Sequence, residues 1–349
     1  MDTNSTSPLV SIIIVNYKNY TDLRECLLSL RRSMYTRKEI IVVDNESDDG
    51  LLKEIENEFR DVQFYAIKEN LNFSEGNNLG IANSKGEIVI LLNCDTAVTE
   101  GWLEPLVREA IKEPAAFYQP RILFSKRKDT INSIGNAVHV LGFAYPKEMG
   151  KNISQISISE EKKEVFYCSG SCVLCSRQIL SKLGGLDSNY WTYYDDVNLG
   201  WKGRLYGYPS YVVPDSTIYH KWGGVYGQLL SYEKLYLLER GRLSSIARNF
   251  TSRSILLLLP AIIFLDIFLI IYLIPKGLAK AKVQATLDFF RNIKLVTNER
   301  KDIQTRRITT DKDIARYMTT KIEHPYFEKI PKKIDQLFIL ISRVIIKML

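Results

Sequence analysis

Few residues of this chain can bind a transition metal or form a disulfide. Its 349 residues include three histidines and five cysteines, and the cysteines are Cys26, Cys94, Cys168, Cys172 and Cys175. The last three follow a C-x3-C-x2-C spacing, but no nearby histidine or cysteine completes the four ligands of a structural zinc site. We therefore expect small buried thiols and, since the count is odd and shows no disulfide framework, a reducing compartment.

The sequence also lacks the signals of nucleic-acid binding and of export. It has no zinc-finger spacing, no RNA-binding signature and no long basic run, so nucleic acid is not an expected partner. The net charge of +7 suits smaller anionic partners such as nucleotide phosphates, or anionic lipid. The first residues, MDTNSTSPLVS, contain no basic region followed by an apolar one, so we expect no signal peptide there.

Apolar strands alternate with amphipathic helices in the first third of the chain. Strand-like runs occupy residues 9–15, 39–43, 62–67 and 87–96, and helix-like patterns occupy residues 20–32, 51–59 and the second part of 69–86. Residues 88–92 form an unbroken apolar run, which is typical of a strand buried on both faces. The alternation predicts an α/β fold with a doubly wound, mostly parallel sheet and helices on both faces.

The pattern is less regular further on. Helices are predicted at 101–112, 177–183 and 195–206, and strands at 117–124, 211–213 and 165–175, the last broken at Gly170. Residues 125–164 are polar, and we expect them to form an irregular insertion or lid.

Polar side chains follow three of the predicted strands. Asn16, Asp44 and Asp95 each stand where a strand ends, and in an open α/β sheet ligands bind at that edge. A carboxylate there can hold a hard divalent cation, although Asp95 taken alone is more typical of a helix cap. The pair Asp195 and Asp196 begins a later helix, where acidic residues often only complement the helix dipole. His220, although a lone histidine is usually structural, opens a Gly-rich aromatic loop.

Four stretches together resemble the family 2 glycosyltransferases with a GT-A fold, especially their bacterial rhamnosyltransferase-like branch. These stretches are VSIIIVNYKNYTDLRECLLSL, EIIVVDNESDDG, ENLNFSEGNNLGIANSKGEIVILLNCDT and WTYYDDVNLGWKGRLYGY. The resemblance covers roughly residues 9–245, and the joint signal is far more specific than any one motif.

The resemblance implies a role for each matched residue. Asp44 is expected at the base or ribose of the nucleotide, Asn16 and Tyr17 in the same pocket, and Asn70, Asn77 and Asn78 in its loop. Asn93 and Asp95 match the first and last positions of a DxD-like motif for Mg²⁺ or Mn²⁺, and His220 matches a histidine near the metal and diphosphate. Asp196 matches the catalytic base, beside Asp195.

Three positions depart from the family pattern. Asn93 gives the metal one charge fewer than an aspartate would, and Asp195 is shorter than the usual glutamate. Asn72 replaces an expected glycine, so we expect a different backbone there. The implied mechanism is inversion, in which Asp196 removes the proton of an acceptor hydroxyl. Asp195 and the aromatic residues around the pair would raise the pKa of that base.

The C-terminal third contains a long apolar run. Residues 255–274 are interrupted only by Pro260 and Asp266, and a straight helix of that length, about 30 Å, matches a bilayer core. Three readings stay open: a spanning helix, a hairpin or interfacial segment broken near Pro260, and a buried helix. A mid-span aspartate needs a partner. Residues 330–349 alternate apolar and basic residues, as an interfacial or oligomer-forming helix does.

We therefore expect a catalytic domain over residues 1–250, membrane-embedded or interfacial helices over 251–296, and a connector with an amphipathic helix over 297–349. The expected function is that of an inverting, metal-dependent hexosyltransferase of cell-envelope polysaccharide synthesis at the cytoplasmic face of the membrane. Its partners would be a nucleotide diphosphate sugar, a saccharide or polyprenyl-linked acceptor, and membrane lipid. The alternatives are a sugar-nucleotide-modifying enzyme or nucleotidyltransferase, and a non-catalytic membrane scaffold.

Overall fold

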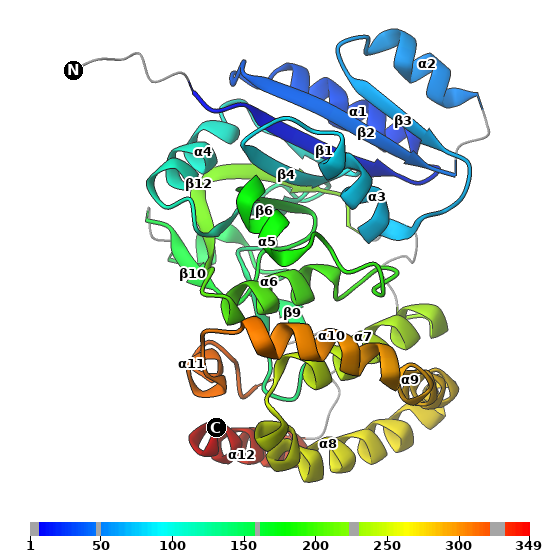
Figure 1. The fold of residues 1–349 in the computed structure, drawn as a ribbon, viewed down its shortest axis with the longest axis vertical. Coiled ribbons are helices and arrows are strands. Elements are labelled where there is room, and N and C mark those ends of the chain that lie inside the picture. Colours follow the sequence, from blue (N-terminus) through cyan, green and yellow to red (C-terminus); the bar gives the residue numbers. More distant parts are fainter. Residues whose placement is uncertain (1–6, 47–49, 158–160, 223–229, 322–331) are drawn as a thin grey trace.

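A mixed sheet organises the N-terminal two thirds of the molecule (Figure 1). The computed structural model describes residues 7–46, 50–157, 161–222, 230–321 and 332–349. Within them, ten strands form the sheet, whose parallel half consists of β3 (Gln63–Ile67), β2 (Lys38–Asn45), β1 (Val10–Asn16) and β4 (Ile88–Asn93) in that order. The predicted α/β fold class is confirmed, with a sheet that turns mixed beyond β4.

The second half of the sheet begins with an antiparallel strand. There β11 (Cys172–Ser176) runs antiparallel to β4 and to β6 (Phe117–Phe124), and β12 (Ser210–His220) runs parallel to β6. The remaining strands are short: β10 (Lys163–Val165) and β5 (Thr96–Val98) pair with β12, and β7 (Ile131–Ser133) pairs with β6.

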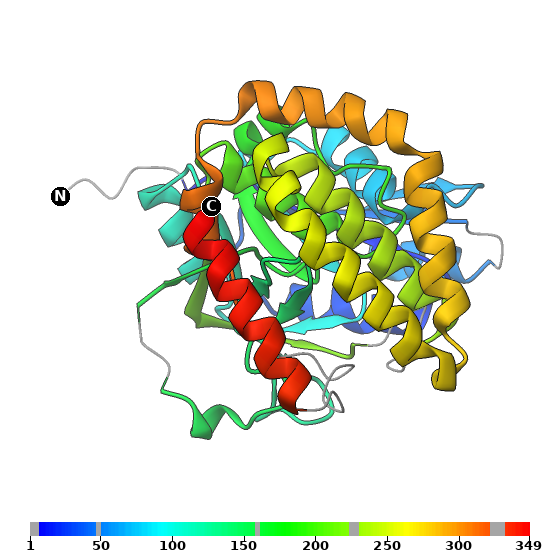
Figure 2. The ribbon, with the colours of Figure 1, turned by 90° about the horizontal axis from the view of Figure 1, so that it is seen from below.

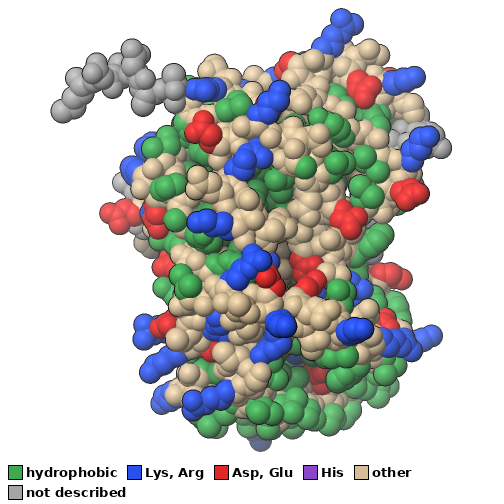
Figure 3. Space-filling view, in the orientation of Figure 1, with side chains coloured by type: hydrophobic (Ala, Val, Ile, Leu, Met, Phe, Trp, Pro, Cys, Tyr) green, Lys and Arg blue, Asp and Glu red, His purple; other side chains and the backbone are tan. Residues whose placement is uncertain are grey.

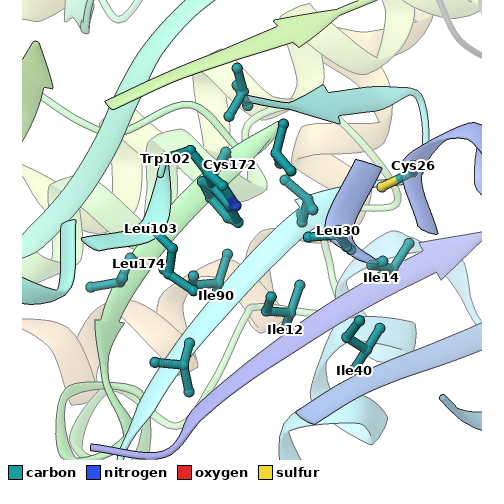
Figure 4. Close-up of a cluster of buried hydrophobic side chains, with 14 of the residues drawn as sticks. Ile12, Ile14, Cys26, Leu30, Ile40, Ile90, Trp102, Leu103, Cys172 and Leu174 are labelled. Carbon is teal, nitrogen blue, oxygen red and sulfur yellow. The ribbon is translucent and has the colours of Figure 1, made fainter. Parts of the chain in front are cut away.

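Helices cover both faces of the sheet because its strands are apolar on both sides. In β1, Ile12 and Ile14 pack toward α1 (Tyr20–Arg31), α2 (Leu51–Glu58) and α4 (Leu103–Lys112). Figure 4 shows this core, with Leu30, Trp102 and Leu174 around the two isoleucines. The intervening Ile13 packs on the opposite side, which carries α3 (Asn72–Ala82), α5 (Arg177–Leu183) and α6 (Asp195–Leu205).

Two sequence-based expectations were wrong. The strand predicted at 211–213 extends to His220, because a register shift between Val213 and Thr217 accommodates Pro214, which has no N–H to donate. The segment 125–164 is not an irregular lid. Its described residues form β7, the hairpin of β8 (Asn136–Val138) and β9 (Ala144–Pro146), and a 3₁₀ turn η1 (Ile153–Gln155), and Val138, Val140, Leu141 and Phe143 are buried.

A second core joins that hairpin to the C-terminal helices, which lie below the sheet (Figure 1). The elements are α7 (Tyr232–Asn249), α8 (Ser252–Leu273), the 3₁₀ turn η2 (Ile274–Lys276), α9 (Ala279–Arg291), α10 (Ile293–Arg306), α11 (Asp311–Ala315) and α12 (Lys332–Met348). The long apolar run thus packs against the rest of the molecule through this second core.

The helix α8 is continuous through Pro260, so of the three interpretations left open, the one with a break near Pro260 is not supported. One face, including Leu258, Leu265 and Leu269, is buried in the second core. Figure 2 shows α8 and α12 on the underside of the molecule, where the rings of Phe264 and Phe338 lie 5.8 Å apart.

The mid-helix Asp266 has the partners that its burial requires. Its carboxylate pairs with Arg242 and, at 3.0 Å, with Lys282, and both cations also pair at 2.8 Å with Glu239. Two acids and two bases therefore neutralise one another between α7, α8 and α9, which offsets the desolvation cost of each.

Candidate functional site

A cleft of about 580 Å³ lies where the predicted strand ends and α6 meet. Of the residues predicted for the site, seven line this cleft: Tyr17, Asn70, Asn93, Asp95, Asp195, Asp196 and His220. Asp95 and Asp196 therefore face one hollow although about a hundred residues separate them. A larger hollow of about 830 Å³ beside β10 contains none of the predicted residues, so the chemistry points to the smaller one.

At one side of the cleft, strand pairing brings Asp95 to His220. Asp95 lies in the turn between β4 and β5, and β5 pairs with β12 so that Thr96 stands opposite His220. As a result Nε2 of His220 lies 3.1 Å from Oδ1 of Asp95, and Nδ1 of His220 lies 3.3 Å from Oδ1 of Asn132. Burial raises the pKa of Asp95, but the neighbouring His220 and Lys221 outweigh it, so the pKa lies below its usual value.

The donor atoms at this side suit a hard divalent cation. Among the described residues no three His, Cys, Asp or Glu side chains form a metal cluster. The cleft nevertheless presents a carboxylate, an imidazole and the amide oxygen of Asn93, which is buried and accepts no hydrogen bond from any described residue. Mg²⁺ typically takes one or two carboxylates and completes its shell with water and phosphate oxygens, so this donor set fits it.

The acid pair occupies the first turn of α6. The carboxylate of Asp196 accepts hydrogen bonds from two main-chain N–H groups, that of Gly170 at 2.9 Å to Oδ2 and that of Val197 at 2.8 Å to Oδ1. Asp196 is half-buried, whereas Asp195 is only 6% exposed. Asp196 is thus held in a defined orientation and still reaches the cleft.

Asp195 and Asp196 are close enough for their titrations to be coupled, and they share one proton. Burial and, after it, the negative charge of Asp196 raise the pKa of Asp195 to about 8. Burial also raises the pKa of Asp196, but its two N–H donors hold that pKa down. The pKa of both carboxyl groups is thus raised, and the two N–H donors make Asp196 the member of the pair in which the charged form is better stabilised.

The loop before α6 has an unusual backbone. Tyr193 and Tyr194 both adopt left-handed conformations, with φ of 62° and 65°, which large side chains rarely do. The phenol of Tyr194 donates a hydrogen bond of 3.0 Å to the carbonyl of Gly142, and a Cβ added to Gly241 of α7 would lie 2.6 Å from its ring. The packing of Tyr194 thus sets where α6 and its acid pair begin.

Asn72, at the position where the family pattern has a glycine, adopts a left-handed backbone conformation. Its φ is 68°, in the left-handed region that asparagine tolerates better than most residues. Its neighbour Asn70 accepts hydrogen bonds of 2.9 Å from the Asn72 N–H and from the side chain of Asn45, which also lines the cleft.

Four predicted residues do not line the cleft. Asn16 and Asp44 are fully buried and bonded to each other, Nδ2 to Oδ1, at 2.6 Å. The amide of Asn77 donates within α3 to Phe73, while Asn78 exchanges two hydrogen bonds with the main chain of Leu186. In this structure these four residues support the walls of the site.

Sequence reasoning did not single out several residues of the cleft. Lys234 of α7 is 5% exposed and lies 5.7 Å from the ring centre of Tyr193 and 5.5 Å from that of Trp222. Burial lowers the pKa of Lys234. Nothing in the local sequence indicates that this lysine or Asn132 belongs to the cleft. Asn45 reaches the cleft because alternate residues of a strand point to opposite faces and the neighbouring Asp44 points toward α1, where it accepts a hydrogen bond from Tyr20.

Comparison with known proteins gives one family and several relatives. Residues 11–184 match the family model Glycosyl transferase family 2. Protein y4gI of Sinorhizobium fredii, of uncharacterised function, is 31% identical over 228 residues, 61% of this chain and 24% of its own length. The low-salt glycan biosynthesis hexosyltransferase Agl10 of Haloferax volcanii is 26% identical over 207 residues, 56% of this chain and 61% of its own length.

A third relative is the N-acetylglucosaminyl-diphospho-decaprenol L-rhamnosyltransferase of Mycobacterium tuberculosis, 25% identical over 233 residues, 61% of this chain and 76% of its own. A crystal structure of GalNAc-T7 with UDP, GalNAc and Mn²⁺ has a TM-score of 0.56 at 16% identity, covering 70% of this chain and 48% of that one. This likeness concerns the fold. The chain thus spans less than two thirds of the first two relatives, y4gI and Agl10.

Proposed function

Since the chain belongs to glycosyl transferase family 2 through residues 11–184, we propose that it is an inverting hexosyltransferase of cell-envelope glycan synthesis. The donor is a nucleotide diphosphate sugar, and the acceptor is a saccharide or a polyprenyl diphosphate-linked sugar. The observation that carries the proposal is that the Asp95–His220 pair and the Asp195–Asp196 pair line one cleft. The rhamnosyltransferase from M. tuberculosis makes rhamnose the first donor sugar to test.

In the proposed reaction Asp196 acts as the base. Its ionised carboxylate takes the proton of an acceptor hydroxyl, and the oxygen attacks the anomeric carbon as the bond to the diphosphate breaks. A single displacement of this kind inverts the anomeric centre. We propose that Asp195 keeps its proton near neutral pH and leaves the charge of the pair on Asp196.

Asp95, His220 and Asn93 are proposed to hold Mg²⁺ or Mn²⁺. When bound, the cation supplies positive charge to the leaving diphosphate. Tyr17 and Asn70, which line the cleft, and Asn45 beside them are proposed to contact the nucleotide. Asn16, Asp44, Asn77 and Asn78 would shape this pocket from behind.

We place the enzyme at the cytoplasmic face of the membrane. In the described chain, one helical stretch, Ser252–Lys276, is long and apolar enough to cross a bilayer, but a third of its apolar core is buried in the protein. Its outward face exposes Ile263 and Ile267, by 51% and 55%, and Figure 3 shows hydrophobic side chains along this underside. A helix packed along its length and apolar outside fits an interfacial position better than a span.

One assay separates this function from its alternatives. The purified chain is incubated with a panel of nucleotide sugars and candidate acceptors, with Mg²⁺, Mn²⁺ or EDTA, and nucleoside diphosphate and glycosidic product are measured together. Release of both, with an inverted anomeric centre by NMR and loss in EDTA, supports the proposal. Consumption of the nucleotide sugar without a glycoside indicates a sugar-nucleotide-modifying enzyme, and no consumption of any donor indicates a scaffold.

A further inference from the structure

A narrow apolar recess adjoins the side of the cleft that holds the acid pair. It measures about 60 Å³, and its walls include Phe143, Leu235, Leu269 and Tyr272. Ala144, Tyr194 and Leu238 line both the recess and the cleft, so the two hollows lie directly beside each other. The volume is several times the ~10–15 Å³ that one water needs, and it suits an isoprene unit.

The recess leads from the catalytic residues toward the underside of the molecule. Its inner wall is Tyr194, which directly precedes Asp195 in the chain. Its outer wall is the end of α8 together with η2, whose Lys276 donates a hydrogen bond of 2.8 Å from Nζ to the hydroxyl of Tyr272 in α8. The same helix carries the exposed apolar face on its other side.

The residues along this path change from charged to apolar in the same order as the diphosphate and the hydrocarbon chain of a lipid-linked sugar. Lys234 lines the cleft, and Leu238, one turn further along α7, lines both hollows. The carboxylate of Glu239, also in the recess wall, is paired with Arg242 and Lys282 and so presents no net charge to an apolar guest. A cation over the cleft and an apolar wall beyond it match a diphosphate followed by a hydrocarbon chain.

We propose that this recess holds the first isoprene unit of a polyprenyl diphosphate-linked acceptor, while the rest of the chain leaves along α8 into the lipid. The inference deepens the proposed function, because it assigns the acceptor to the lipid-linked class. A free saccharide would gain nothing from the recess, since its hydroxyls would lose water without finding partners along the leucine side chains.

Photolabelling of the full-length chain in detergent tests this inference. The probe is farnesyl diphosphate carrying a benzophenone, and the labelled peptides are mapped by mass spectrometry. Labelling within residues 232–249 and 265–276 that farnesyl diphosphate competes, but inorganic pyrophosphate does not, is the expected result. Equal competition by pyrophosphate would indicate a diphosphate site alone, and labelling spread over the outer faces of α8 and α12 would indicate adsorption; either result overturns the proposal.

Two neighbouring variants provide a matched comparison. Tyr272→Asp puts a charge in the recess and should weaken farnesyl diphosphate binding at least about tenfold. Ile271→Asp makes the same change next to it, at a side chain that is 62% exposed and outside the recess, and should leave binding unchanged. If both variants bind farnesyl diphosphate equally well, the proposal that the recess binds its hydrocarbon chain is refuted. If the chain releases nucleoside diphosphate but does not bind the probe, only the proposal that the recess binds an isoprene unit is refuted. If the chain binds the probe but turns over no donor, the proposed transferase function is refuted.

Discussion

The main-chain N–H of Gly170 donates a hydrogen bond of 2.9 Å to Oδ2 of Asp196, from a segment that precedes the acid pair by more than twenty residues. The approach is close enough to exclude a side chain without movement, because a Cβ at position 170 would lie 3.2 Å from the Cβ of Asp196. Gly170 therefore both orients the proposed base and leaves space for it.

Gly170→Ala should displace Asp196 by a few tenths of an ångström. We expect kcat to fall about tenfold, because proton transfer depends on the placement of the base, while KM for the donor changes little. Steady-state nucleoside diphosphate release, with thermal unfolding as the check on folding, measures both constants. An unchanged kcat in a stably folded variant would show that this contact does not position the base.

Asp196→Asn should abolish transfer while preserving the shape of the site. The loss of a general base typically reduces the rate by about 10²–10⁴. Binding of the nucleotide sugar, followed by calorimetry, should stay within a few-fold of wild type, since the amide has the same size. Asp215→Asn, at a carboxylate that is 54% exposed and paired with Arg108 on the surface, is the matched control. Near-wild-type turnover of Asp196→Asn would remove Asp196 from the base role.

Asp195→Asn should change how stability depends on pH. Because the folded-state pKa of Asp195 is raised to about 8, the folded chain binds a proton more tightly than the unfolded chain between about pH 4 and pH 8. Its contribution to stability is therefore full below pH 4 and is lost as pH rises through 8. Asparagine cannot ionise, so the variant should be more stable than wild type at pH 8, by at least about 1 kcal/mol, and the gap should close toward pH 4.

Urea unfolding of both proteins across this pH range measures the difference, in which the titrating groups other than the coupled Asp196 cancel. A gap that does not vary with pH would mean that Asp195 ionises in the folded protein as it does in water.

The sequence predicted the parts of the site that rest on local rules. The rule that ligands bind where strands end predicted Asp95 at the cleft, although it predicted Asn16 and Asp44 there as well. The role of Asp196 followed from the family resemblance and not from a local rule. The sequence could not predict that Asp44 faces the interior, because the choice between Asp44 and Asn45 depends on which face of β2 carries α1. It missed Lys234 because a single lysine on a helix carries no local signal.

The errors in the fold have a common cause in long-range packing. Residues 125–164 look irregular because their apolar residues follow neither helical nor strand spacing, yet the second core buries Val138, Leu141 and Phe143. The apolar run of α8 was ambiguous for a related reason. Its composition allows a span, and only the positions of α7 and α9 reveal that Asp266 has partners inside the protein.

The underside of α8 and α12 provides the last prediction. We expect the chain to float with vesicles of phosphatidylglycerol and phosphatidylethanolamine, and Ile263→Glu combined with Ile267→Glu to weaken that binding more than tenfold, because each change puts a charge where an apolar side chain enters lipid. Exposed Lys276, Lys332 and Lys347 border the face, so binding should also weaken with salt.

Met34→Glu is the control, since Met34 is 61% exposed but follows α1 at the opposite end of the molecule (Figure 1). Turnover of a water-soluble acceptor should be the same in all three proteins. If the wild-type chain does not float, the membrane proposal fails. A different outcome is that the double variant floats as well as the wild type, while light scattering shows a dimer for the wild type and a monomer for the variant. The face would then bind a second copy of the chain, which the amphipathic pattern of α12 also allows.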